Sequence, residues 1–129
     1  GGIVRSAAEA RAIAASARRV AVLGIKPESR ANQPAHYVPA YLQSAGVEVV
    51  PVPTFYPDVT EILGQKVYRT VASIPGGIDV VDVFRKPEDV PAHLEDLLAA
   101  RPRCVWMQSG IAHEPTAQAL AAAGIAVVQ

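Results

Sequence analysis

The sequence has a single cysteine, few aromatic residues and no excess of charge of either sign. Cys104 is the only cysteine among 129 residues, so the chain forms no internal disulfide and has no cysteine-rich zinc site. A lone thiol is typical of a reducing compartment, and we expect a cytoplasmic protein. Twelve Lys and Arg residues balance twelve Asp and Glu residues. Because nucleic-acid binders carry a basic excess, we expect no nucleic-acid partner.

Long apolar runs are also absent. No apolar stretch reaches the roughly 18 residues that a membrane-spanning helix needs, so we expect no membrane partner. Half of the residues are nevertheless hydrophobic and only 19% are charged, which excludes a wholly disordered chain. The length is close to the commonest domain size. We therefore expect a single domain over residues 1–129, with an N-terminal helix within residues 1–17 that packs on it.

Buried-strand patterns and helical patterns alternate along the chain. The sequence predicts strands at 20–24, 47–52, 78–84, 104–107 and 125–128, and helices at 7–17, 37–45, 87–100 and 114–123. A short helical piece at 59–63 and a small edge strand at 66–68 are predicted in between. The continuous apolar strands are typical of a parallel sheet that is covered on both faces. The sequence thus predicts an α/β fold, a three-layer, Rossmann-like open parallel sheet of about five strands.

Ligands of such a sheet bind beyond the carboxyl ends of its strands. The loop that follows the first strand is the richest in polar groups, since Gly24 is followed by Lys26, Ser29, Arg30 and Asn32. Glycine allows a close backbone approach, and the next helix offers free amides and a partial positive charge. This combination suits phosphate groups. A solvated polar loop with incidental charges is the alternative interpretation.

Three later loops reach the same edge of the sheet. Val52 and Pro53 form an apolar wall for an adenine ring or simply end a strand. Arg85 pairs with a ligand phosphate or with a neighbouring carboxylate, and the segment 108–110 leaves a gap for a thin polar chain or makes a tight turn. The sequence contains neither the G-x-G-x-x-G fingerprint of dinucleotide binding nor a Walker A loop.

Together these motifs resemble the CoA-binding domain family, which is similar to the N-terminal CoA-binding domain of succinyl-CoA synthetase alpha subunits. The resemblance covers about residues 18–129. It is carried by V-A-V-L-G at 20–24 with Ser29-Arg30, P-V-P at 51–53, V-V-D-V-F-R at 80–85 and W-M-Q-S-G at 106–110. Many members have V-N-P after the second strand, whereas this chain continues from Val52-Pro53 into Thr54.

The resemblance implies that coenzyme A lies along the carboxyl ends of the strands. The loop 24–30 and the following helix would contact its phosphates, Val52-Pro53 would flank the adenosine, and the residues at 83–85 would line the floor. The pantetheine arm would lie near Gln108 and Gly110. The expected cofactor-binding residues are Gly24, Ile25, Lys26, Ser29, Arg30, Asn32, Val52, Pro53, Val83, Phe84, Arg85, Gln108 and Gly110.

No catalytic or metal-binding constellation is evident. His36 at the start of a helix is expected to cap it or to face solvent, with contact to a phosphate as the alternative. His93 is expected on the surface, and Cys104 is expected to pack in a strand. The leading hypothesis is a small non-catalytic protein that binds CoA or an acyl-CoA. Two alternatives stay open. One is an enzyme acting on an acyl-CoA or a nucleotide, through His36 or His113. The other is a protein-interaction module with a vestigial nucleotide site, in which Phe55 and Tyr56 anchor the partner. The partner is a second copy of the chain (a homo-oligomer) or another protein.

Overall fold

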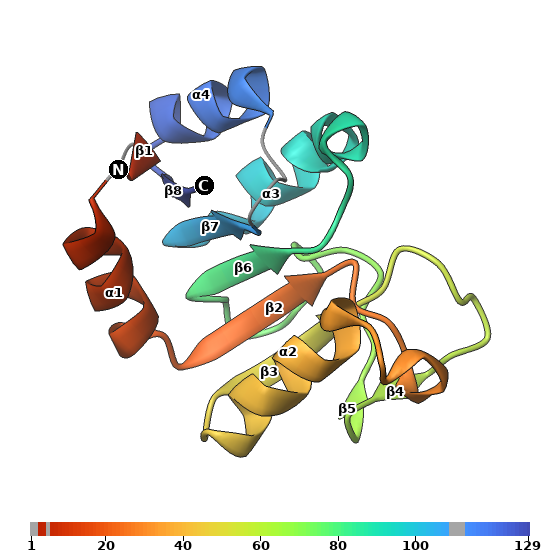
Figure 1. Ribbon diagram of the computed structural model, residues 1–129. Coiled ribbons are helices and arrows are strands. Elements are labelled where there is room, and N and C mark those ends of the chain that lie inside the picture. Colours follow the sequence, from red (N-terminus) through yellow and green to blue (C-terminus); the bar gives the residue numbers. More distant parts are fainter. Residues whose placement is uncertain (1–2, 5, 109–112) are drawn as a thin grey trace.

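The computed structural model describes residues 3–4, 6–108 and 113–129. Six strands of this described part form one parallel sheet in the order β1-β8-β7-β6-β2-β3 (Figure 1). The order reverses between β2 and β6, which is the switch point of a Rossmann-like sheet. The predicted fold class is therefore confirmed, with six strands in place of about five. In chain order the strands are β1 (Ile3–Val4), β2 (Arg19–Leu23), β3 (Glu48–Val52), β6 (Val80–Val83), β7 (Cys104–Met107) and β8 (Ala126–Val128).

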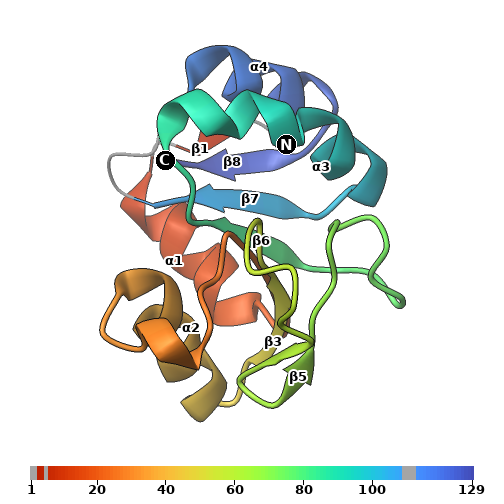
Figure 2. The ribbon, with the colours of Figure 1, turned by 90° about the vertical axis from the view of Figure 1, so that its right-hand side faces the viewer.

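Helices cover both faces of the sheet (Figure 2). One face carries α1 (Ala7–Ser16) and α2 (Pro34–Ser44), and the other carries a 3₁₀ helix (Pro87–His93), α3 (Leu94–Ala100) and α4 (Glu114–Ala122). Side chains of β2 alternate between two cores. Val20 and Val22 pack on the α1 and α2 side, while Ala21 and Leu23 pack on the α3 and α4 side. Burial on both faces explains the continuous apolar runs of the strands.

The edge strand β1 has no counterpart in the predicted pattern. Its two residues pair with β8, with Ile3 opposite Val127 and Val4 opposite Val128. Two residues are too few to show a periodic pattern, so only the neighbouring strand defines this element. The helix α1 that follows it is capped by Ser6, whose Oγ accepts a hydrogen bond from the amide of Glu9 at 3.3 Å.

The segment between β3 and β6 departs from expectation. The helical piece predicted at 59–63 is wrong, because β4 (Glu61–Ile62) and β5 (Gln65–Lys66) form an antiparallel hairpin. Leu63 and Gly64 between them have positive φ values of 55° and 73°, as in a type I′ turn. Leucine is unusual at such a position, so the usual sequence signal of this turn is missing. The edge strand predicted at 66–68 is confirmed only at its first residue.

Two helices differ from their predicted bounds. The stretch 87–100 is α-helical only from Leu94 onward. Its first half is a 3₁₀ helix that contains Pro91, which has no N–H for an α-helical bond. Helix α2 begins at Pro34, three residues before the predicted start. None of the helices in the described ranges is long and apolar enough to cross a membrane.

Candidate functional site

The carboxyl ends of β3, β2 and β6 meet at the switch point of the sheet. The amide of Gly24 donates to the carbonyl of Val52 at 2.9 Å, and the amide of Phe84 donates to the carbonyl of Leu23 at 2.8 Å. These bonds extend the sheet by one residue beyond the strands. They bring together three of the four loops in which the sequence places the site.

Gly24 has a structural reason to be glycine. Its φ is +91°, and a β-carbon at this position would lie 2.2 Å from the carbonyl oxygen of Phe84 and 3.2 Å from Cδ of Arg85. The space beside Gly24 is therefore filled by the chain itself, whereas the sequence suggested that it admits a ligand. The consequence for the site is that the Arg85 side chain lies over Gly24, at the point where β2 and β6 separate.

The loop after β2 offers side-chain charge rather than helix amides. Helix α2 begins with Pro34, which has no N–H, and the amides of His36 and Tyr37 both donate to the carbonyl of Gln33. The Lys26 amine donates to the Gln33 side chain. Ser29, Arg30 and Asn32 are exposed, and the Arg30 guanidinium makes no hydrogen bond within the described part of the chain. The backbone amides at the start of α2, which were expected to be free for a ligand, thus largely donate to acceptors within the protein.

His36 braces this loop from inside. The expectation that it caps the helix or faces solvent is wrong, since it is only 6% exposed. Its Nδ1 lies 2.9 Å from the carbonyl oxygen of Lys26, which requires an N–H at Nδ1, and its Nε2 lies 3.8 Å from the carboxylate of Glu28. The same carboxylate accepts from the amide of Leu63 at 2.9 Å. The loop after β2, which is the candidate phosphate-binding loop, is therefore hydrogen-bonded to the β4–β5 hairpin through Glu28.

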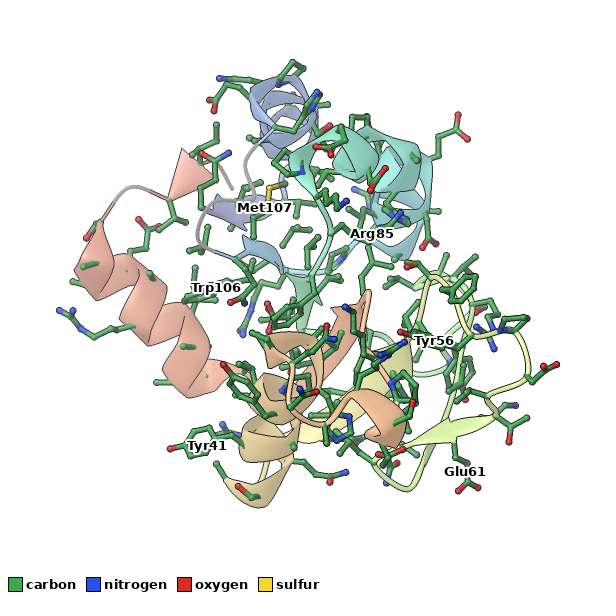
Figure 3. The ribbon with its side chains drawn as sticks, turned by 45° about the vertical axis from the view of Figure 1, so that its right-hand side comes forward. Tyr41, Tyr56, Glu61, Arg85, Trp106 and Met107 are labelled. Carbon is green, nitrogen blue, oxygen red and sulfur yellow. The ribbon has the colours of Figure 1, made fainter. Side chains whose placement is uncertain are left out.

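A pocket of about 540 Å³ opens at this edge of the sheet. Of the predicted site residues it is lined by Pro53 and Arg85. Thr54, Phe55 and Pro57 come from the loop after β3, and Arg69 and His93 come from segments to which the sequence analysis gave no binding role. The Phe55 ring is 70% exposed. Arg85 and the neighbouring Tyr56 lie on the same side of the molecule in Figure 3.

Arg85 is held in this pocket by the 3₁₀ helix. Its Nε donates to His93 Nε2 at 3.2 Å, and its guanidinium lies 3.8 Å from the carboxylate of Asp89. Burial lowers the pKa of His93 below 6.5, and the positive charge of Arg85 lowers it further. His93 is thus neutral at pH 7 and accepts a hydrogen bond. His93 was expected on the surface. It is half-buried and lines the carboxyl-edge pocket, where it contacts Arg85.

Gln108 belongs to a different hollow. It donates to the carboxylate of Asp82, and both line a cavity of about 220 Å³ between α1 and α2. Asp82 is 6% exposed, and its burial raises the pKa of the carboxyl to about 6, against the opposing effect of the Gln108 hydrogen bond. Sequence reasoning missed Asp82 as a site residue. The signal that could have identified it is a single carboxylate within the otherwise apolar strand V-V-D-V.

The remaining predicted residues divide by burial. Ile25, Val52 and Val83 are at most 1% exposed, so their side chains are core and only their backbone faces the site. Phe84 is half-buried and packs in the core on the α1 and α2 side. Gly110 lies outside the described residues.

Comparisons with known proteins identify the family of this chain. A sequence model described as the CoA binding domain matches residues 18–129. The chain belongs to the CoA-binding domain family. It is 34% identical over 123 residues to the uncharacterized protein YneT of Bacillus subtilis (strain 168), covering 95% of this chain and 87% of YneT.

Solved structures show the same fold. The protein called cell-free ID.343 from Thermus thermophilus is 39% identical, with a TM-score of 0.85 over 96% of this chain and 90% of that one. The dinucleotide forming acetyl-coenzyme A synthetase 1 of Ca. Korarchaeum cryptofilum, in complex with phosphate and ADP, has a TM-score of 0.71 at 21% identity. It is matched over 86% of this chain and 25% of its own length. At that identity the likeness shows a shared fold only.

The carboxyl edge of this CoA-binding domain fits the chemistry of coenzyme A. The cofactor combines several phosphate charges with a flat adenine ring. The pocket at this edge is lined by the cation of Arg85 and the exposed Phe55 ring, and a cation with an aromatic face suits a phosphorylated nucleotide.

Arg69 holds the wall of the pocket in place. Its guanidinium donates to the carbonyls of Phe55, Tyr56, Pro57 and Val59 at 2.9–3.3 Å. We expect Arg69→Lys to cost about 1 kcal/mol of unfolding free energy, because an ammonium cannot span these carbonyls as a planar fork does. Urea denaturation measures the loss, and faster proteolysis within 54–59 locates it. Arg30→Lys is the control, and equal stability of the two variants would contradict this role.

Proposed function

We propose that this protein is a non-catalytic module that holds CoA or an acyl-CoA at the carboxyl edge of its sheet. The observation that carries the proposal is the position of Arg85. It lies over Gly24 at the switch point and faces the pocket that Phe55 lines. Ligands of Rossmann-like sheets bind in this crevice, so a cation at this point can contact the phosphates of a bound nucleotide.

The two sides of the pocket offer different chemistry. Arg85 supplies charge for the phosphates, and Phe55 with Pro53 supplies an apolar surface for the adenine ring. The exposed Arg30, in the loop after β2 and outside the lining of this pocket, is a second cation for the phosphates. The charge of Arg69 adds to the positive field, although its N–H groups are directed at backbone carbonyls. CoA is thus favoured over NAD, since CoA has an additional phosphate on its ribose.

The histidines and the cysteine have structural roles, which supports recognition without catalysis. In the pocket itself, His93 accepts a hydrogen bond from Arg85. His36 is buried against the carbonyl of Lys26, and His113 caps α4, where its Nδ1 accepts from the amide of Thr116 at 3.3 Å. Burial raises the pKa of the Cys104 thiol to about 11, so it stays protonated and is a poor nucleophile.

The test is calorimetric titration with CoA, 3′-dephospho-CoA and NAD. We expect CoA to bind best, and we expect Arg85→Gln and Arg30→Ala each to weaken it about tenfold, because each removes one charged contact to phosphate. The melting temperature of Arg30→Ala should stay close to that of the parent, since its side chain is exposed.

The matched control is Arg101→Asn. It removes the same charge at the opposite edge of the sheet, just before β7, and asparagine tolerates the left-handed backbone of this position (φ 49°). CoA binding should be unchanged in this variant. Equal binding of CoA by all four proteins, or no binding of CoA at all, would contradict the proposal.

A further inference from the structure

The cavity between α1 and α2 is a second hollow that recognition of the nucleotide does not use. It has a volume of about 220 Å³ and lies over β2, β6 and β7. Figure 3 shows Trp106 on this side of the sheet. Ala14 of α1 and Val38 and Leu42 of α2 form its sides, and Asp82 and Gln108 are the two polar residues of its lining.

We propose that this hollow, here called the interhelical cavity, receives the acyl group of an acyl-CoA whose nucleotide end is held at the carboxyl edge. This inference rests on the proposed function and names the class of thioester that the protein prefers. The acyl group is a hydrocarbon chain of medium length.

Strand β6 connects the two places. Asp82 within β6 lines the interhelical cavity, and Arg85, three residues further, lines the carboxyl-edge pocket. Three residues of strand span about 10 Å. The two hollows lie on opposite faces of the sheet, because Arg85 contacts His93 and Asp89 of the 3₁₀ helix while Asp82 lies between α1 and α2. The pantetheine arm of CoA is longer than this separation, so one acyl-CoA that passes over the carboxyl end of β6 has the reach to occupy both. Gln108, which follows β7, stands where the cavity meets the carboxyl edge.

The cavity is polar at one end and apolar at the other, as is a thioester with a hydrocarbon tail. Asp82 and Gln108 lie toward the carboxyl ends of their strands, while Val20, Val47 and Val80 line the cavity toward the amino ends. When the polar thioester lies near Asp82 and Gln108, its hydrocarbon tail lies among the valine side chains. A free fatty acid fits less well. The pKa of Asp82 is raised only to about 6, so above that pH its carboxylate repels a second one.

The size of the cavity sets the chain length. A volume of about 220 Å³ accommodates about seven groups of the size of a water molecule, each taking about 30 Å³. A methylene is similar in size, so acyl chains up to about eight carbons fit. Each methylene that is buried increases affinity by up to about fourfold.

The experiment uses Trp106, which is the only tryptophan of the chain and lines the cavity. Its fluorescence and calorimetry follow titration with CoA and with its acetyl, butanoyl, hexanoyl and octanoyl thioesters. We expect the Kd to fall with every pair of added methylenes, by about fourfold to fifteenfold per pair. We expect the Trp106 emission to shift to shorter wavelength as the chain displaces water.

A cavity-filling variant and a matched control decide where the chain binds. Ala14→Phe places a ring in the cavity from its exposed rim. Ala15→Phe makes the same change one residue later on α1, at an exposed position that does not line the cavity. We expect Ala14→Phe to bind CoA like the parent but to lose the gain with chain length, and Ala15→Phe to keep it. Val38→Phe, from α2, repeats the test if Ala14→Phe folds poorly.

The outcomes separate this inference from the proposed function. If CoA binds but chain length has no effect on affinity, the acyl assignment is wrong and the proposed function stands. If Ala14→Phe and Val38→Phe keep the full gain, the chain binds elsewhere and the assignment is again wrong. If the cavity instead faces a second copy of the protein, sizing chromatography will show a dimer that Ala14→Phe dissociates, with no chain-length effect. Failure of CoA itself to bind overturns both proposals.

Discussion

Replacing Gly24 with alanine is expected to lower the free energy of unfolding by about 3 kcal/mol or more. Two costs add. The left-handed backbone (φ +91°) is unfavourable for alanine by about 1 kcal/mol. The new β-carbon would lie 2.2 Å from the Phe84 carbonyl oxygen, so the ends of β2 and β6 must separate. Urea denaturation measures the total.

Gly46→Ala isolates the first of these costs. Gly46 has almost the same backbone angle, φ +95°, but a β-carbon there meets nothing within 4 Å. We expect this control to lose about 1 kcal/mol. Gly24→Ala should also weaken CoA binding, because it displaces the Arg85 side chain that lies over residue 24. Equal losses in the two variants would show that the chain relaxes around residue 24 at no cost.

The strands of the sheet could be predicted because strands buried on both faces consist of continuous runs of apolar residues. Val20 to Leu23 is apolar at every position, and both of its faces are covered by helices, so neither face needs a polar residue. Elements defined by long-range contact left no such signal. Strand β1 exists only because it pairs with β8, and the β4–β5 hairpin turns through Leu63, a residue that rarely takes positive φ.

The place of a residue in the candidate site could be predicted where strand ends alone define it, and not where it depends on partners from elsewhere in the chain. Gly24, Pro53 and Arg85 follow strands directly, and parallel order brings them to one edge. Arg69 and His93 reach the pocket through a loop and a 3₁₀ helix, whose paths depend on packing. The pairing of Asp82 with Gln108 also depends on packing, since it requires β6 and β7 to be neighbours.

Replacing Asp82 with asparagine is expected to stabilise the protein by about 3 kcal/mol at pH 8 and to change little at pH 4. Burial raises the pKa of Asp82 from 3.8 to about 6. Between these values the folded protein holds a proton that the unfolded chain has lost, so the stability of the parent falls as the pH rises from about 4 to above 6. The difference between the two pKa values corresponds to about 3 kcal/mol once both states are ionised. Asparagine avoids that cost and still accepts the Gln108 hydrogen bond.

Asp79→Asn provides a control of opposite sign. The Asp79 carboxylate accepts from the amides of Arg18 and Arg19, both at 3.0 Å, and these bonds lower its pKa. Its charge therefore stabilises the fold above the pKa of the unfolded chain, and this stability is lost as the pH falls. We expect Asp79→Asn to destabilise at pH 8, where Asp82→Asn stabilises. Urea denaturation at pH 4, 6 and 8 compares them. A loss of stability in Asp82→Asn at pH 8 would mean that the fold depends on the ionised carboxylate, and the interhelical cavity would then be a charged site rather than an acyl site.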